Sequence, residues 1–111
     1  MSHKIVNLTL PIVIREIDDV LEEYPVHPYQ KAFAIDEVRK KLLAHVLSYI
    51  PNRYIVLDET QEPPKDDDFI YRSLEERVRI ESLIRGSILH ILRENADLVS
   101  RHVYQIDSSI N

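Results

Sequence analysis

The segment from Ser73 to Leu92 constrains the fold of this chain more than any other part of the sequence. Ser73 is followed three residues later by Glu76, which is the pattern of a capping box at the start of a helix. The apolar residues behind it recur at helical spacing; they are Leu74, Val78, Ile80, Leu83, Ile84, Ile88, Leu89, Ile91 and Leu92. They wrap more than half of the helix circumference, which is more than one packing partner can cover. We therefore predict either the central helix of a bundle or a helix that also forms a dimer seam.

Gly86, the only glycine in the chain, falls inside this predicted helix. Glycine in a helix interior costs roughly 1 kcal/mol relative to alanine, so the position needs a reason. A close crossing with another helix is one reason and a ligand that approaches the backbone is the other; we favour the crossing.

Two more helices are predicted from apolar spacing and from the positions of prolines. The first covers about residues 9 to 24, because Pro11 is tolerated in a first turn and Pro25 ends the helix. Its charged residues fill most of the positions between the apolar ones; they are Arg15, Glu16, Asp18, Asp19, Glu22 and Glu23. A short linker follows, and the second helix covers about residues 35 to 50, closed by Pro51.

The rest of the chain has weaker patterns. Residues 54–57 are β-branched or aromatic and predict a short strand or an extended segment. Residues 58–68 are acidic, contain two prolines and lack an apolar anchor, which indicates a mobile, solvated loop between two halves of one domain. Residues 98–106 fit either a continued helix or a short strand, and periodicity does not decide between them.

Length and composition indicate one ordinary globular domain over residues 1–111. We expect a mainly α-helical fold of three main helices with room for short strands. Charges interrupt every apolar stretch before it reaches bilayer length, so we expect no membrane segment and no export signal. The chain has no cysteine, which suits the cytoplasm, and its net charge of −5 opposes direct nucleic-acid binding.

The sequence contains no recognisable catalytic constellation, and we expect no enzymatic activity, cofactor or bound metal. One glycine excludes a glycine-rich phosphate loop, and both a G-x-S-x-G elbow and a cysteine nucleophile are missing. The five histidines never lie four residues apart and none belongs to an H-E-x-x-H pattern; they are His3, His27, His45, His90 and His102. Asp66, Asp67 and Asp68 are best explained as part of the solvated loop.

The polar residues that do cluster in the sequence are basic and aromatic. An Arg side chain can stack on a purine and bond guanine O6 and N7 or a phosphate, and a Tyr ring offers a second stacking face. The candidate ligand-binding residues are Arg39, Asn52, Arg53, Tyr54, Tyr71 and Arg72. In the alternative, which composition alone favours, Arg39, Lys40 and Lys41 form a solvated face and Arg53 caps helix carbonyls. Arg77, Glu81 and Arg85 are predicted to form a surface ion-pair ladder of little energetic weight.

The stretch LLAHVLSYIPNRY at residues 42–54 is similar to the late-competence ComFB family. That family has a helix of the type L-A-x-x-L-N followed by a proline and R-Y, and the matching residues are Leu43, Ala44, Leu47, Pro51, Arg53 and Tyr54. The resemblance covers about residues 7 to 58. The chain departs from the family at Lys41 and Ser48, where Asp and Asn are common. It also lacks the cysteine cluster of many members, which removes any expectation of structural zinc.

The resemblance implies a small helical homodimer that acts as a receptor for cyclic dinucleotides, notably cyclic di-GMP and also cyclic di-AMP. Such a receptor passes the signal to a regulatory protein partner, for example a transcription factor. Cyclic di-GMP has twofold symmetry, which a homodimer with paired Arg and Tyr residues would match. Arg53 would then bind phosphate or guanine, with Tyr54 or Tyr71 stacking and Arg39 or Arg72 assisting. The competing hypotheses are a helical adaptor without a small ligand and a DNA-binding helical domain, which the acidic charge opposes.

Overall fold

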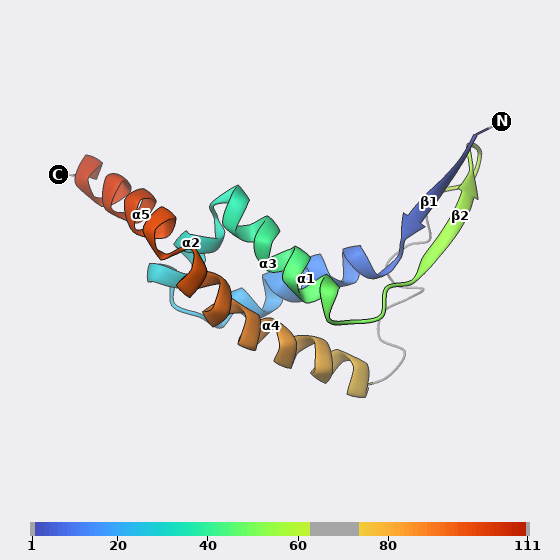
Figure 1. Ribbon diagram of the computed structural model, residues 1–111, viewed down its shortest axis with the longest axis horizontal. Helices are drawn as coiled ribbons and strands as arrows, with labels where there is room; N and C mark the ends of the chain where they lie inside the picture. Colours follow the sequence, from blue (N-terminus) through green and yellow to red (C-terminus); the bar gives the residue numbers. More distant parts are fainter. Residues whose placement is uncertain (1, 63–73, 111) are drawn as a thin grey trace.

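The structure is a computed structural model that describes residues 2–62 and 74–110, with side chains as far as Val103 in the last helix. Its described part is mainly helical, as the sequence predicts, and carries one small sheet (Figure 1). In chain order the elements are β1 (His3–Asn7), α1 (Thr9–Glu22), the irregular segment η1 (Val26–Gln30), α2 (Lys31–Phe33), α3 (Asp36–Ser48), β2 (Tyr54–Asp58), α4 (Leu74–Glu94) and α5 (Ala96–Ile110).

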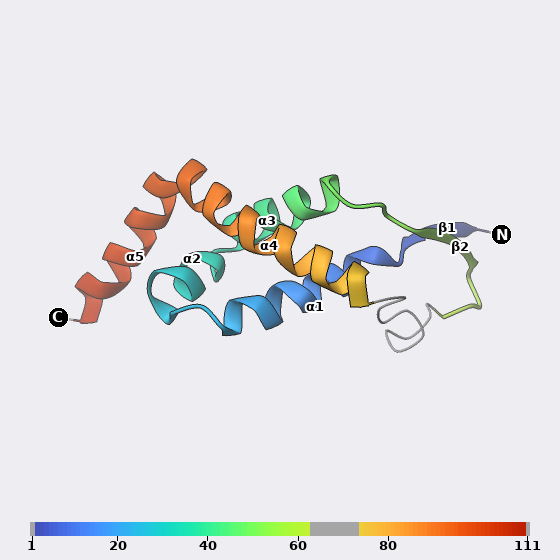
Figure 2. The ribbon, with the colours of Figure 1, turned by 90° about the horizontal axis from the view of Figure 1, so that it is seen from below.

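The core lies where α4 packs against both α1 and α3, and Figure 2 shows α4 running alongside these two helices. The predicted central position of α4 is therefore confirmed. Its buried apolar side chains meet those of the other two helices; the set includes Val13, Ile17 and Val20 of α1, Val38, Leu42 and Val46 of α3, and Ile80, Ile84, Ile88 and Ile91 of α4. One expectation for α1 is wrong, because Glu16 is fully buried instead of lying on the charged face.

The two strands pair in antiparallel orientation with Ile5 opposite Val56. The predicted strand at residues 54–57 is confirmed as β2, whereas its partner β1 was not expected. The resulting ribbon extends beyond the helices at the N-terminal end of the molecule (Figure 1). Ile5, Val56 and Tyr54 are exposed on one face of this ribbon, while Leu57 on the other face is buried. Leu57 is nevertheless not part of the apolar core formed by the helices.

The start of the predicted acidic loop has an anchor that the sequence analysis overlooked. The Asp58 carboxylate accepts hydrogen bonds from the backbone N–H of Thr60 at 2.8 Å and of Gln61 at 3.1 Å. These bonds and one from the Thr60 hydroxyl lower the pKa of Asp58. Residues 58–61 therefore form a defined turn at the end of β2. The remainder of the predicted loop, from residue 63 onward, lies outside the described residues.

The predicted linker after α1 and the undecided C-terminal segment pack against each other. Ala32 and Phe33 of α2 are buried in the core, so this linker is anchored. Residues 98–106 are helical, since they belong to α5, which contacts α2 and buries Val99 and Val103. The break between α4 and α5 falls at Asn95, whose side-chain amide donates to the carbonyl of Ile91 at 2.8 Å.

Gly86 does not mark a helix crossing. A Cβ atom built at this position meets no atom within 4 Å, and the residue is exposed on α4. The predicted close approach of a second helix is therefore wrong for the described part of the chain. None of the helices described here combines the length and apolar character required to cross a membrane.

Candidate functional site

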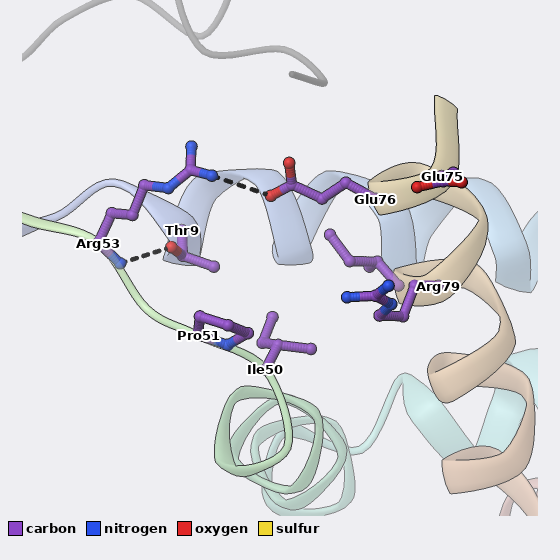
Figure 3. Close-up of a pocket in the computed structure, with 8 residues that line it drawn as sticks. Thr9, Ile50, Pro51, Arg53, Glu75, Glu76 and Arg79 are labelled. Carbon is purple, nitrogen blue, oxygen red and sulfur yellow. Dashed lines mark hydrogen bonds and ion pairs between the residues drawn. The ribbon is translucent and has the colours of Figure 1, made fainter. Parts of the chain in front are cut away.

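A cleft opens where the first turn of α1, the end of α3 and the first turns of α4 come together (Figure 3). Its volume is about 250 Å³. One Arg side chain comes from each side of the cleft, Arg53 from the segment before β2 and Arg79 from α4, and apolar side chains lie between them. The complete lining is Thr9, Ile50, Pro51, Arg53, Glu75, Glu76, Arg79 and Ile80.

The backbone of Arg53 is fixed from both directions by the start of α1. Its N–H donates to the Thr9 hydroxyl at 2.9 Å, and its carbonyl accepts from the N–H of Leu8 at 2.8 Å. Thr9 is itself buried. Arg53 therefore has little backbone freedom, which suits a residue that must present its guanidinium in one place.

Asn52 joins the end of α3 to the start of α1. Its side-chain amide donates to the carbonyls of Leu47 at 2.8 Å and Ile50 at 3.0 Å, and its oxygen accepts from Asn7 at 3.0 Å. The oxygen of Asn7 in turn accepts from two backbone N–H groups at the start of α1. Asn52, and not Arg53, is thus the residue that caps the carbonyls of α3, and its role here is structural.

The charges around the cleft are balanced and loosely paired. The Arg53 guanidinium lies 3.5 Å from the Glu76 carboxylate, at the limit of a hydrogen bond, and both side chains are about one-third exposed. Figure 3 shows Arg79 extending toward the apolar side formed by Ile50 and Pro51. The cleft can therefore offer cationic donors, carboxylate acceptors and an apolar surface to one bound group.

The other predicted site residues do not gather at this cleft. Arg39 pairs with Asp18 of α1 and lines a separate groove with Gln30 and Phe33. Tyr54 is exposed on β2 and is not part of the cleft lining. Tyr71 and Arg72 lie outside the described residues. Four of the six predicted residues are described, and Arg53 is the one among them that lines the cleft. Asn52 supports it from the end of α3.

The basic run on α3 follows the alternative interpretation. Lys40 pairs with Asp36 at 2.9 Å, and Lys41 with Glu37 at 3.6 Å, both at i, i+4 spacing on the exposed side of the helix. Lys41 also donates to the Asn95 side chain at 2.9 Å. These pairs indicate a solvated, self-compensated face with little energetic weight.

Sequence reasoning missed the contribution of Arg79 and of Thr9 to the cleft. Arg79 follows Glu76 by three residues, which places both side chains on one side of the first turns of α4. That spacing was a usable signal. Thr9 gave no such signal, because its bond to Arg53 joins segments 44 residues apart.

A second polar group joins α3 and α4 away from the cleft. His45 Nδ1 lies 2.9 Å from the buried Ser87 hydroxyl, and the rings of His45 and His90 have centroids 4.8 Å apart. The sequence analysis considered histidine spacing along one helix only and so could not see a pair formed between two helices. Across the described residues, no three or more side chains converge in a way that could hold a metal ion.

Comparisons with protein-family models, with curated proteins and with solved structures found no match.

Proposed function

We propose that this chain is a non-enzymatic cyclic dinucleotide receptor in the cytoplasm, with cyclic di-GMP as the first ligand to test and a regulatory protein as the recipient of the signal. The observation that carries the proposal is the placement of Arg53 and Arg79 on two sides of one cleft with an apolar surface between them. The resemblance of residues 42–54 to the ComFB family supplies the ligand class.

The chemistry of the cleft suits a phosphorylated purine. A guanidinium can bond a phosphate in bidentate fashion or bond O6 and N7 of guanine, and it can stack on the base. Ile50 and Pro51 offer an apolar surface for one face of a ring. Arg39 is not part of the proposed site, because it lines the separate groove beside Asp18.

The size of the cleft bears on the oligomeric state. Ligand pockets usually measure roughly 300–1,000 Å³, whereas this cleft measures about 250 Å³. One cleft would therefore enclose part of a dinucleotide, and two clefts of a homodimer would enclose both halves of a twofold-symmetric ligand. Analytical ultracentrifugation at high micromolar concentration tests the dimer, and a species of 13.1 kDa would contradict it.

Isothermal titration is the direct test of the receptor proposal. Purified protein is titrated with cyclic di-GMP, cyclic di-AMP and GMP, and we expect a cyclic dinucleotide to bind more tightly than the mononucleotide. Arg79→Ala should weaken binding, while Arg85→Ala serves as the matched control, since Arg85 lies on the same helix but pairs with Glu23 away from the cleft. No binding of either cyclic dinucleotide at tens of micromolar would reject the proposal.

A helical adaptor without a small ligand is the second candidate, and one observation favours it. Leu74, Val78 and Leu89 are exposed along α4, and an apolar stripe of this kind is typical of a protein contact. A thermal shift separates the two candidates. A ligand at a hundredfold excess over its Kd stabilises the folded state by about 2.7 kcal/mol, whereas an adaptor would not respond to cyclic dinucleotides.

A further inference from the structure

Glu16 has the most unusual environment of any described ionisable residue in the chain. It lies on α1 with none of its surface exposed, in the interface with α4. Among the described residues, neither of its carboxylate oxygens has a hydrogen-bond partner. Burying an unpaired carboxylate costs several kcal/mol, and a protein usually avoids that cost by keeping the group protonated. The position is therefore a candidate for a proton-dependent function.

The charged groups around Glu16 come from both helices. On α4, the Arg77 Nε lies 3.8 Å from a Glu16 oxygen and 3.1 Å from a Glu81 oxygen, so its hydrogen bond goes to Glu81. Asp19 adds a further negative charge from α1 itself. Two carboxylates from facing helices therefore share one guanidinium, and the closer of the two to Arg77 is Glu81 and not the buried Glu16.

We propose that Glu16, Arg77 and Glu81 form a proton-operated latch between α1 and α4. With its proton, Glu16 can donate a hydrogen bond to Glu81, and Arg77 stays paired with Glu81. Without it, two carboxylates compete for one guanidinium at the edge of the interface, and the contact between the helices weakens. Both helices also form walls of the cleft, α1 through Thr9 and α4 through Ile80, so the state of the latch acts on the cleft.

Glu16 changes its protonation state near neutral pH, which is where such a latch would operate. Burial, followed by the interaction with the neighbouring Glu81 carboxyl group, raises the pKa of Glu16 from 4.5 to about 7, against the opposing charge of Arg77. A raised pKa in the folded state means that the stabilisation is complete below pH 4.5, is lost progressively as the pH rises to about 7, and is absent above that.

Urea unfolding between pH 5 and pH 8 tests the latch with Glu16→Gln, which is neutral at every pH. We expect the ratio of the unfolding constants of wild type and Glu16→Gln to rise toward tenfold per pH unit between pH 5 and pH 7 and to level off above pH 7. Glu22→Gln is the matched control, since Glu22 is an exposed carboxylate on the same helix. It should follow wild type throughout. A ratio for Glu16→Gln that does not change with pH would overturn the proposal.

A direct titration keeps the test valid if Glu16→Gln does not fold. The carboxyl carbon of Glu16 in the wild-type protein is followed by NMR across the same pH range. A midpoint near 7, moving upward in Arg77→Gln because a favourable positive charge is lost, supports the latch. A midpoint below 5, or one that does not respond to Arg77→Gln, contradicts it.

Discussion

Helix α1 contacts its neighbours through two polar regions that differ in how their hydrogen bonds are satisfied. At its start, the Asn7 amide donates to the Asn52 side chain at 3.0 Å, and the Thr9 hydroxyl accepts from the backbone N–H of Arg53 at 2.9 Å. Two turns further along, Glu16 is more deeply buried but lacks a hydrogen bond, and its nearest cation is 3.8 Å away. The hydrogen bonds of the first region join neutral groups, whereas the second region contains charged side chains.

The difference shows what each region can do. Neutral amides and hydroxyls that satisfy one another in a half-buried site fix a geometry and do not change with pH. A buried carboxylate that must share its cation is poorly stabilised and responds to protons. The start of α1 is therefore suited to position Arg53 at the cleft, and the middle of α1 is suited to change its contact with α4.

Asn52→Ala should give the largest effect on stability, because it removes hydrogen bonds that join the start of α1 to the end of α3. It removes one bond to the Leu47 carbonyl of α3 and one to the Ile50 carbonyl just after the helix, and it leaves the Asn7 amide without its acceptor. At about 1 kcal/mol for each bond, we expect a loss of about 3 kcal/mol in urea unfolding. Ser48→Ala is the control, since the exposed Ser48 bonds only a carbonyl of its own helix, and it should stay within about 0.5 kcal/mol of wild type.

Arg53→Ala should affect binding and leave stability nearly unchanged. The Arg53 backbone bonds persist in the variant, while a charge-assisted contact with the ligand is lost, so cyclic di-GMP binding should weaken by about 1.5–3 kcal/mol. Arg53→Lys should recover little, because an ammonium keeps the charge and loses the planar fork. If Arg53→Ala instead lowers the melting temperature and binds cyclic di-GMP normally, Arg53 has a structural role and the adaptor hypothesis is favoured.

Glu16→Leu should stabilise the protein at pH 8, which would show that the second region, unlike the first, contains a destabilising polar group. An apolar side chain removes the buried charge, and Arg77 keeps its pair with Glu81. Replacing buried charges by apolar groups of similar volume is often stabilising by about 1–4 kcal/mol, and we expect a gain near the lower end. The gain should shrink at pH 5, where wild-type Glu16 holds its proton. A loss at pH 8 would mean that ionised Glu16 stabilises the fold.

The sequence predicted α1, α3, α4 and β2 because these elements depend on local patterns. Apolar spacing located α1, α3 and α4, and Pro25 and Pro51 follow the ends of the first two. β1 was missed because a strand of five residues gains its stability from its partner, which is more than 45 residues away in the chain. The same limit applies to the ordered contacts of α2, whose three residues show no period.

The candidate site could be predicted only in part. Arg53 was found from its position after Pro51, but the cleft depends on Thr9 and Arg79, which long-range folding brings to it. Glu16 could have been identified, because it lies three residues after Val13 and four before Val20, at the spacing of the buried face. The sequence analysis placed Glu16 on the charged face because of its residue type, although the helical spacing of the apolar residues was the better indicator. The predicted ladder likewise holds for Arg77 and Glu81 but not for Arg85, which pairs with Glu23 at the C-terminal end of α1.

Gly86→Ala should give the smallest effect, and it tests whether the exposed side of α4 is open. Alanine gains about 1 kcal/mol over glycine in a helix interior, and the added methyl group meets no atom within 4 Å. We therefore expect a rise in Tm of roughly 4 °C, measured at low protein concentration. Ser82→Ala, one turn earlier on the same exposed side, should gain less. If the gain disappears at high concentration, where the predicted homodimer would form, a second copy covers Gly86 and the methyl group obstructs it. If the gain is the same at all concentrations, this side of α4 stays open, and a homodimer must use another surface.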